Sequence, residues 1–183
     1  MSKSLHTIQT LAKLGKIFSQ IIFICCLVGG IGSLVGIAVL LGADGLVIGG
    51  KDITAMFISE SDIARETMIF ACIAAFIASA AECVLSKFAN VYFKHELASG
   101  TPFTVEGSKE ILRLGILTIA IPMGALILEK IAFSVYCEFF TVAEQFRMED
   151  MSGVGLGVMF IVASVIFRYG AELSARKSLD ENE

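Results

Sequence analysis

The stretch Ile17–Leu41 reads IFSQIIFICCLVGGIGSLVGIAVLL and contains no charged residue. A helix rises about 1.5 Å per residue, so a run of this length can cross a hydrocarbon layer of about 30 Å. Three further apolar runs follow, at Thr67–Leu85, Ile111–Leu128 and Val154–Tyr169. The sequence therefore predicts an all-α polytopic membrane protein, in which four transmembrane helices form one small bundle over residues 1–183.

The composition agrees with this fold class. Hydrophobic residues make up 56% of the chain, above the roughly 45–50% of an ordinary soluble domain. There is no tryptophan, so aromatic anchors at the membrane interface must be Phe or Tyr. The five cysteines include no C-x-x-C pair, and we interpret them as small packing residues. We expect no metal site and no cofactor.

The basic residues are unevenly distributed between the connections. Ten of the 14 Lys and Arg residues lie in the N-terminal segment, around the connection 86–110 and at the C-terminal end. The connections 42–66 and 129–153 hold the other four and are rich in acids. The positive-inside rule therefore places both termini and the loop 86–110 in the cytoplasm, and makes 42–66 and 129–153 ectoloops. The expected location is the inner, or cytoplasmic, membrane.

Glu82 is the only acidic residue well inside a predicted span. A carboxylate in lipid costs several kcal/mol unless it is paired or reaches water. Counted along the helices, Arg113 and Arg168 lie at about the same depth, so the three residues could form an intramembrane charge cluster that clamps three helices. Two other interpretations stay open, namely that Glu82 extends to the headgroups or that it forms a proton or cation site.

Small residues recur at the four-residue spacing that lets helices approach closely in lipid. Gly32 and Gly36 form such a pair in the first span, and Gly153 and Gly157 form one at the start of the fourth. We predict packing within the bundle, with homo-oligomer formation as the alternative. Pro122 lies midway along the third span and predicts a kink, which could be static or a hinge.

The connection 86–110 contains a clear helix break. Residues 92–98 continue the second helix, and Ser99-Gly100-Thr101-Pro102 then ends it. Thr104 is a candidate N-cap for the helix that enters the third span, with Ser108 as a competing candidate.

No recognisable set of catalytic residues is present. His6 and His95 are isolated in the sequence, and no phosphate-binding loop, nucleophile motif or paired carboxylate motif occurs. The basic residues are dispersed and lack interleaved aromatic residues, which argues against direct nucleic-acid binding. We therefore expect a non-enzymatic protein.

Two segments resemble one bacterial family. Gly100-Thr101-Pro102-Phe103-Thr104, followed by Arg113-Leu114-Gly115, resembles a "G-x-P-F-T … L-R-x-G" segment, and Phe167–Leu173 resembles an "F-x-Y-G-x-x-L" ending. Both are similar to motifs of the membrane-protein family catalogued as domain of unknown function 2975. Members are small four-span proteins, often encoded beside a short helix-turn-helix regulator. Here Ala175-Arg176-Lys177 departs from the family's usual acidic tail.

The resemblance implies a cytoplasmic partner surface made of Phe103, Thr104, Tyr169, Gly170 and the C-terminal tail. The simpler interpretation is a turn, a helix cap and an interface anchor. We expect a membrane regulator or accessory protein that engages a cytoplasmic partner, which the resemblance suggests is a helix-turn-helix, DNA-binding regulator. The alternative function is a small transporter or channel subunit that uses Glu82 and the Pro122 kink.

Overall fold

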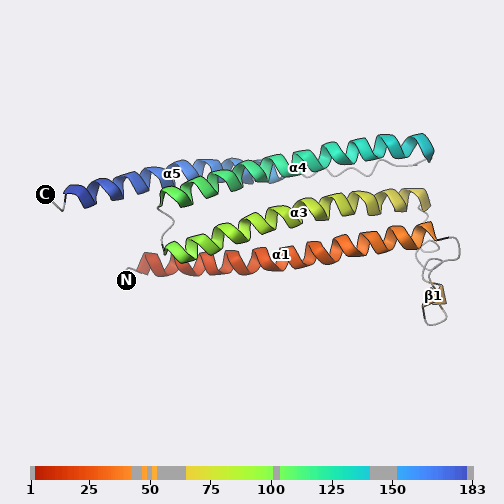
Figure 1. Cartoon of the computed structure of the whole chain (residues 1–183), viewed down its shortest axis with the longest axis horizontal. Coiled ribbons are helices and arrows are strands. Elements are labelled where there is room, and N and C mark those ends of the chain that lie inside the picture. Colours follow the sequence, from red (N-terminus) through yellow and green to blue (C-terminus); the bar gives the residue numbers. More distant parts are fainter. Residues whose placement is uncertain are drawn as a thin grey trace. The chain divides into compact units, whose positions relative to one another are not determined.

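Four long helices dominate the structure, a computed structural model (Figure 1). It describes residues 3–42, 47–48, 51–52, 65–100, 104–140 and 152–180, with side chains for residues 9–42, 65–100, 104–140, 154–173 and 176. The helices are α1 (Lys3–Leu41), α3 (Arg65–Ser99), α4 (Val105–Phe139) and α5 (Ser152–Asp180). The strands β1 (Val47–Ile48) and β2 (Lys51–Asp52) pair antiparallel, with Val47 opposite Asp52.

All four helices are long and apolar enough to cross a membrane, over Gln9–Leu41, Arg65–Ser99, Val105–Phe139 and Val154–Leu173. Within the apolar windows of these helices, only 11–22% of the residues are buried against the protein. Large apolar side chains such as Val28, Ile127 and Val165 are more than half exposed. In water such surfaces would be unfavourable, so they fit contact with lipid. The predicted all-α fold with four membrane-crossing helices is confirmed.

The helices extend well past the apolar runs. Most of the connection predicted at 86–110 is helical, because α3 continues to Ser99 and α4 begins at Val105. Likewise α4 continues to Phe139, inside the ectoloop predicted from residue 129. Hydropathy marks only the part of a helix that suits lipid, whereas the backbone hydrogen bonds of a helix can continue into water. A helix of 35 residues is about 52 Å long, which exceeds the hydrocarbon thickness of about 30 Å.

The chain divides into two compact units. The first unit comprises Met1–Ile24, Cys83–Pro122 and Asp150–Glu183, and the second comprises Cys25–Glu82 and Met123–Glu149. The core of the first unit is formed by Tyr92, Ile111 and Leu114, which are at most 7% exposed. Seven partly buried residues pack against these three: Leu85, Phe88, Ala89, Phe93, Phe160, Ala163 and Phe167.

A polar contact joins α1 to α3 in the first unit. The amide Nδ2 of Asn90 donates to the carbonyl oxygen of Lys16 at 3.3 Å and to Oγ of Ser19 at 3.2 Å. Beside it, Gly15 lies so close to the ring of Phe93 that an added Cβ would come within 2.5 Å of that ring. Because interhelical hydrogen bonds and small residues are what hold helices together in lipid, this contact fixes the pairing of α1 with α3.

The second unit is held by an aromatic cluster and an arginine cap. Phe70 is 1% exposed, and its ring centroid lies 5.0 Å from that of Phe133 in an edge-to-face arrangement. The guanidinium of Arg65 donates to the carbonyl oxygens of Leu40 and Gly42, with its Nε 2.6 Å from the Leu40 oxygen. The last carbonyl groups of a helix lack partners within it, so Arg65 on α3 completes the end of α1.

Candidate functional site

The turn between α3 and α4 is defined by Gly100 and Thr104, two residues of the first unit. Gly100 has a φ of 72°, and its N–H donates to the carbonyl oxygen of Glu96 at 3.1 Å. A glycine in this left-handed conformation commonly ends a helix, because other residues are strained there. At the start of α4, Oγ1 of Thr104 accepts the N–H of Gly107 at 2.9 Å. The predicted Thr104 cap is thus confirmed.

The competing candidate, Ser108, is not the cap. Its hydroxyl donates to the carbonyl oxygen of Ser164 on α5 at 3.0 Å, and both serines are at most 5% exposed. A hydroxyl buried between two helices must find an acceptor, and here that acceptor belongs to the neighbouring helix.

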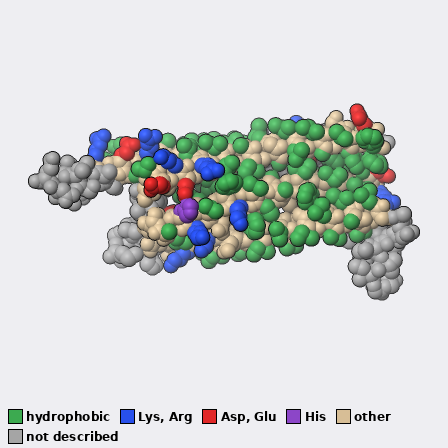
Figure 2. All heavy atoms as spheres, in the orientation of Figure 1, with side chains coloured by type: hydrophobic (Ala, Val, Ile, Leu, Met, Phe, Trp, Pro, Cys, Tyr) green, Lys and Arg blue, Asp and Glu red, His purple; other side chains and the backbone are tan. Residues whose placement is uncertain are grey.

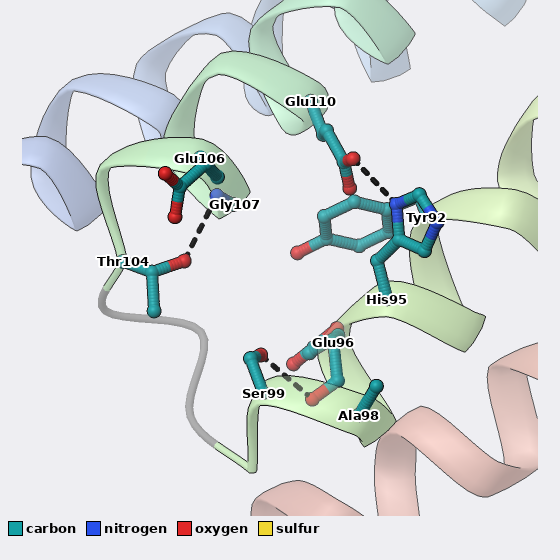
Figure 3. A pocket seen from close by; sticks show the side chains of 9 residues that line it. All are labelled: Tyr92, His95, Glu96, Ala98, Ser99, Thr104, Glu106, Gly107 and Glu110. Carbon is teal, nitrogen blue, oxygen red and sulfur yellow. Dashed lines mark hydrogen bonds and ion pairs between the residues drawn. The ribbon is translucent and has the colours of Figure 1, made fainter.

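A pocket of about 440 Å³ lies between the end of α3 and the start of α4 (Figure 3). Nine residues line it: Tyr92, His95, Glu96, Ala98, Ser99, Thr104, Glu106, Gly107 and Glu110. Figure 3 shows the carboxylates of Glu96, Glu106 and Glu110 around one opening, two from α4 and one from α3. We call it the acidic pocket.

The polar groups of the acidic pocket are partly paired with each other. Nδ1 of His95 lies 2.6 Å from Oε1 of Glu110. The carboxylate of Glu96 interacts with the hydroxyl of Tyr92, whose ring is 7% exposed and belongs to the core. Glu106 is exposed at the rim. With three carboxylates and one imidazole, the pocket suits a cationic group.

The acidic pocket does not have the arrangement of a metal centre. Among the residues that the structure describes, no group of three or more His, Cys, Asp or Glu side chains could hold a metal ion. The hydroxyl of Ser99 donates to the carbonyl oxygen of Glu96, at 3.1 Å. The three acids and the volume of the pocket suit it to bind a cationic group.

The residues of the predicted charge cluster occupy different surroundings. Arg113 lies on α4 of the first unit, with its guanidinium carbon 5.4 Å from the ring centroid of Phe88, a cation–π distance. Arg168, on α5 of the same unit, pairs with Glu172 at 3.2 Å. Glu82 belongs to the second unit, where it is exposed. The three-residue cluster stays a prediction.

The glycine pairs differ in what they contact. A Cβ at Gly157 would lie 2.8 Å from the carbonyl oxygen of Gly115 and against Ile119, so α4 and α5 approach backbone to backbone. A Cβ at Gly36 would lie 3.0 Å from Sγ of Cys72. Gly32 has nothing within 4 Å, so it does not bring α1 and α3 together. Gly153 lies within α5, but its surroundings fall outside the described side chains.

The predicted partner surface is described only in part. Phe103 lies outside the described residues, and Thr104 lines the acidic pocket. Tyr169 is 65% exposed on α5, beside the half-buried Gly170.

The sequence analysis missed the acidic pocket, because it treated His95 as isolated. One signal was available. His95 and Glu96 precede the helix break, and Glu106 and Glu110 follow it. Two polar pairs that flank a short turn between helices must lie near each other.

The comparisons with known proteins gave no relative. No family model, no curated protein and no solved structure matches this chain. The resemblance to domain of unknown function 2975 therefore stays a prediction, while the fold makes the chain a multi-pass, all-α membrane protein.

Proposed function

We propose that this chain is a non-enzymatic regulatory or accessory protein of a bacterial inner membrane, and that it engages a cytoplasmic partner through the acidic pocket. One observation carries the proposal, namely that three carboxylates from two helices surround an open pocket at a helix turn. The turn includes the segment that resembles domain of unknown function 2975. A partner that inserts a Lys or Arg side chain would place a cation among these acids, where charge-assisted hydrogen bonds form.

The distribution of cations supports a cytoplasmic first unit. Figure 2 shows basic and acidic side chains together on the surface of this unit. The Lys and Arg residues of the second unit include Lys51 in β2 and, among residues with described side chains, Arg65 and Lys130. Those of the first unit, counting residues with described side chains, are Lys13, Lys16, Lys87, Lys94, Lys109, Arg113, Arg168 and Arg176. By the positive-inside rule, this distribution supports a cytoplasmic position for the acidic pocket and both termini.

The partner that fits is a small basic protein. The resemblance suggests a helix-turn-helix regulator, and DNA-binding proteins carry the clustered Lys and Arg residues that an acidic pocket would attract. Binding at the membrane would hold such a regulator away from DNA by occupying part of its basic surface.

Site-specific crosslinking in cells tests the proposal. A photoreactive residue at Ala98, which lines the pocket, should capture a DNA-binding protein, whereas one at the exposed Ile131 of the second unit should not. The double variant Glu106→Gln/Glu110→Gln should reduce capture by the probe at Ala98 about tenfold or more, since hydrogen bonds to charged groups commonly contribute over 1.4 kcal/mol. The control Glu138→Gln, an exposed acid of the second unit, should leave capture unchanged.

Two results would overturn the proposal. Equal capture at Ala98 and Ile131 would show that the pocket is not the contact site. Capture of this chain alone would favour the transporter alternative, and ion flux should then be measured with Glu82→Gln.

Orientation has its own test. A reporter that is active only outside the cytoplasm should work when fused after Lys51 and fail when fused after Gly100. The reverse pattern would place the acidic pocket on the outer side and remove access to any cytoplasmic regulator.

A further inference from the structure

A second hollow lies on the first unit, between α4 and α5. It has a volume of about 680 Å³. Two features fix the pairing of these helices. The Ser108 hydroxyl donates to the Ser164 carbonyl oxygen at 3.0 Å, and Gly115 faces Gly157 two turns further along. Gly115 follows Ser108 by seven residues on α4, whereas Gly157 precedes Ser164 by seven residues on α5. The helices are therefore antiparallel, with a register fixed within the hollow by Ser108 and Ser164 and beyond one end of it by Gly115 and Gly157.

The hollow, which we call the α4–α5 groove, combines cations with apolar walls. Lys109 from α4 and Arg168 from α5 both line it, and both are exposed. The walls include Leu112, which is 38% exposed, and Val165, which is 64% exposed. Such a lining suits a ligand with an anionic head and a hydrocarbon tail.

The register brings the two cations toward each other. The Ser108–Ser164 pair sets Arg168 of α5 level with Thr104 of α4. Lys109 comes five residues after Thr104, so the backbone positions of Lys109 and Arg168 are roughly 7 Å apart along the helix axis. In a helix each Cα–Cβ bond tilts toward the N-terminus. Because α4 and α5 are antiparallel, the long side chains of Lys109 and Arg168 lean toward each other's level. One phosphate can therefore contact both side chains.

The acid in the groove does not cancel this charge. Glu172 accepts from Nε of Arg168 at 3.2 Å, and the two side chains are 53% and 71% exposed. An exposed pair of this kind contributes little by itself. The guanidinium has several further N–H donors, and Lys109 adds a second cation, so the groove keeps a net positive charge.

We propose that the α4–α5 groove binds an anionic membrane phospholipid, with its phosphate between Lys109 and Arg168 and an acyl chain along Leu112 and Val165. The groove lies toward the end of the candidate span Val154–Leu173, and Arg168 comes five residues before that end. Tyr169, 65% exposed beside it, is the residue type that anchors a helix at the interface. This inference requires only that the helices lie in a membrane.

Native mass spectrometry of the full chain in detergent tests the proposal, with phosphatidylglycerol as the probe and phosphatidylcholine as the neutral comparison. The double variant Lys109→Gln/Arg168→Gln should bind phosphatidylglycerol roughly 30-fold more weakly, or about 2 kcal/mol, since each cation near a lipid surface contributes about 1 kcal/mol. The matched control Lys94→Gln/Arg176→Gln removes two exposed cations outside the groove and should change binding by less than about threefold.

A charge-preserving variant separates lipid binding from folding. Lys109→Arg/Arg168→Lys should keep the preference for phosphatidylglycerol, and circular dichroism of each lipid-free variant should show unchanged helix content. If the double Gln variant fails to fold, the single variant Lys109→Gln tests the proposal instead. Its affinity for phosphatidylglycerol should fall about fivefold.

Several results would overturn the proposal. Equal losses in the groove and control variants would show that only overall charge matters. Equal binding of phosphatidylcholine would show that the groove does not recognise the net negative charge of the lipid headgroup. Displacement of the lipid by millimolar glycerol 3-phosphate would indicate a site for a soluble phosphate, and a lipid-free dimer that shields Lys109 would indicate that a second copy fills the groove.

Discussion

Nδ1 of His95 on α3 lies 2.6 Å from Oε1 of Glu110 on α4, across the turn that carries the acidic pocket. Fifteen residues separate the two in sequence, including the helix break at Gly100. The contact ties the two sides of the turn together where the proposed partner would bind.

Removing this contact should have a small effect on folding. The imidazole and carboxylate side chains are 57% and 34% exposed, and exposed ion pairs contribute about 0–1 kcal/mol. Glu110→Gln should therefore lower the free energy of unfolding by less than about 1 kcal/mol. Thermal melts in detergent measure this. A loss above about 2 kcal/mol would show that the pair contributes more than an exposed contact does.

Gly157 should tolerate no side chain. An added methyl would collide with the Gly115 carbonyl oxygen at 2.8 Å, and backbone cannot move aside cheaply. Gly157→Ala should therefore destabilise the protein by about 1–3 kcal/mol, the usual cost of overpacking. The control is Gly155→Ala, two residues away on the same helix, which meets nothing within 4 Å.

Because alanine is the better helix former by up to about 1 kcal/mol, Gly155→Ala should be neutral or stabilising. Unfolding by a denaturing detergent compares the two variants. Equal destabilisation by both would mean that α4 and α5 do not approach at Gly115.

The Ser108 hydroxyl should contribute to the pairing of α4 with α5. Ser108→Ala would leave the buried Ser164 carbonyl oxygen without this donor, and hydrogen bonds between membrane helices contribute about 0.6–1.7 kcal/mol. Ser33→Ala is the control, since its hydroxyl bonds to Gly29 of its own helix at 2.9 Å. Denaturation midpoints should fall for Ser108→Ala and stay close to the original for Ser33→Ala. A fall of equal size in both would argue against a contact between the helices.

Glu82→Gln should leave stability nearly unchanged. The side chain is exposed on α3 and, in the interpretation in which it extends to the headgroups, it reaches water, where substitutions usually change stability by no more than about 0.5 kcal/mol. Melts in detergent and in lipid discs check this expectation. A loss above about 2 kcal/mol in lipid would instead establish the charge cluster with Arg113 and Arg168, because breaking a buried pair has a cost of that size.

The connection 86–110 shows what local composition predicts correctly and what it misses. Ser99-Gly100 correctly marked a helix end and Thr104 a helix start, because caps depend on a few adjacent residues. The span boundaries fell short of the helix ends, because hydropathy reports the change from lipid-facing to polar side chains while the helix itself continues.

The sequence by itself determined the class of this protein. Four long, mostly apolar runs must satisfy their backbone groups internally in lipid, and only helices can do so within one segment each. Run length, caps and charge distribution are all local properties, so they can be counted along the chain.

Only the tertiary structure decided which side chains meet. Gly157 contacts the neighbouring helix while Gly32 contacts none, although both lie in the same four-residue pattern. Arg113 lies over Phe88, and His95 meets Glu110. These outcomes depend on the rotation and register of each helix against its neighbour, which are set by the packing of both surfaces together.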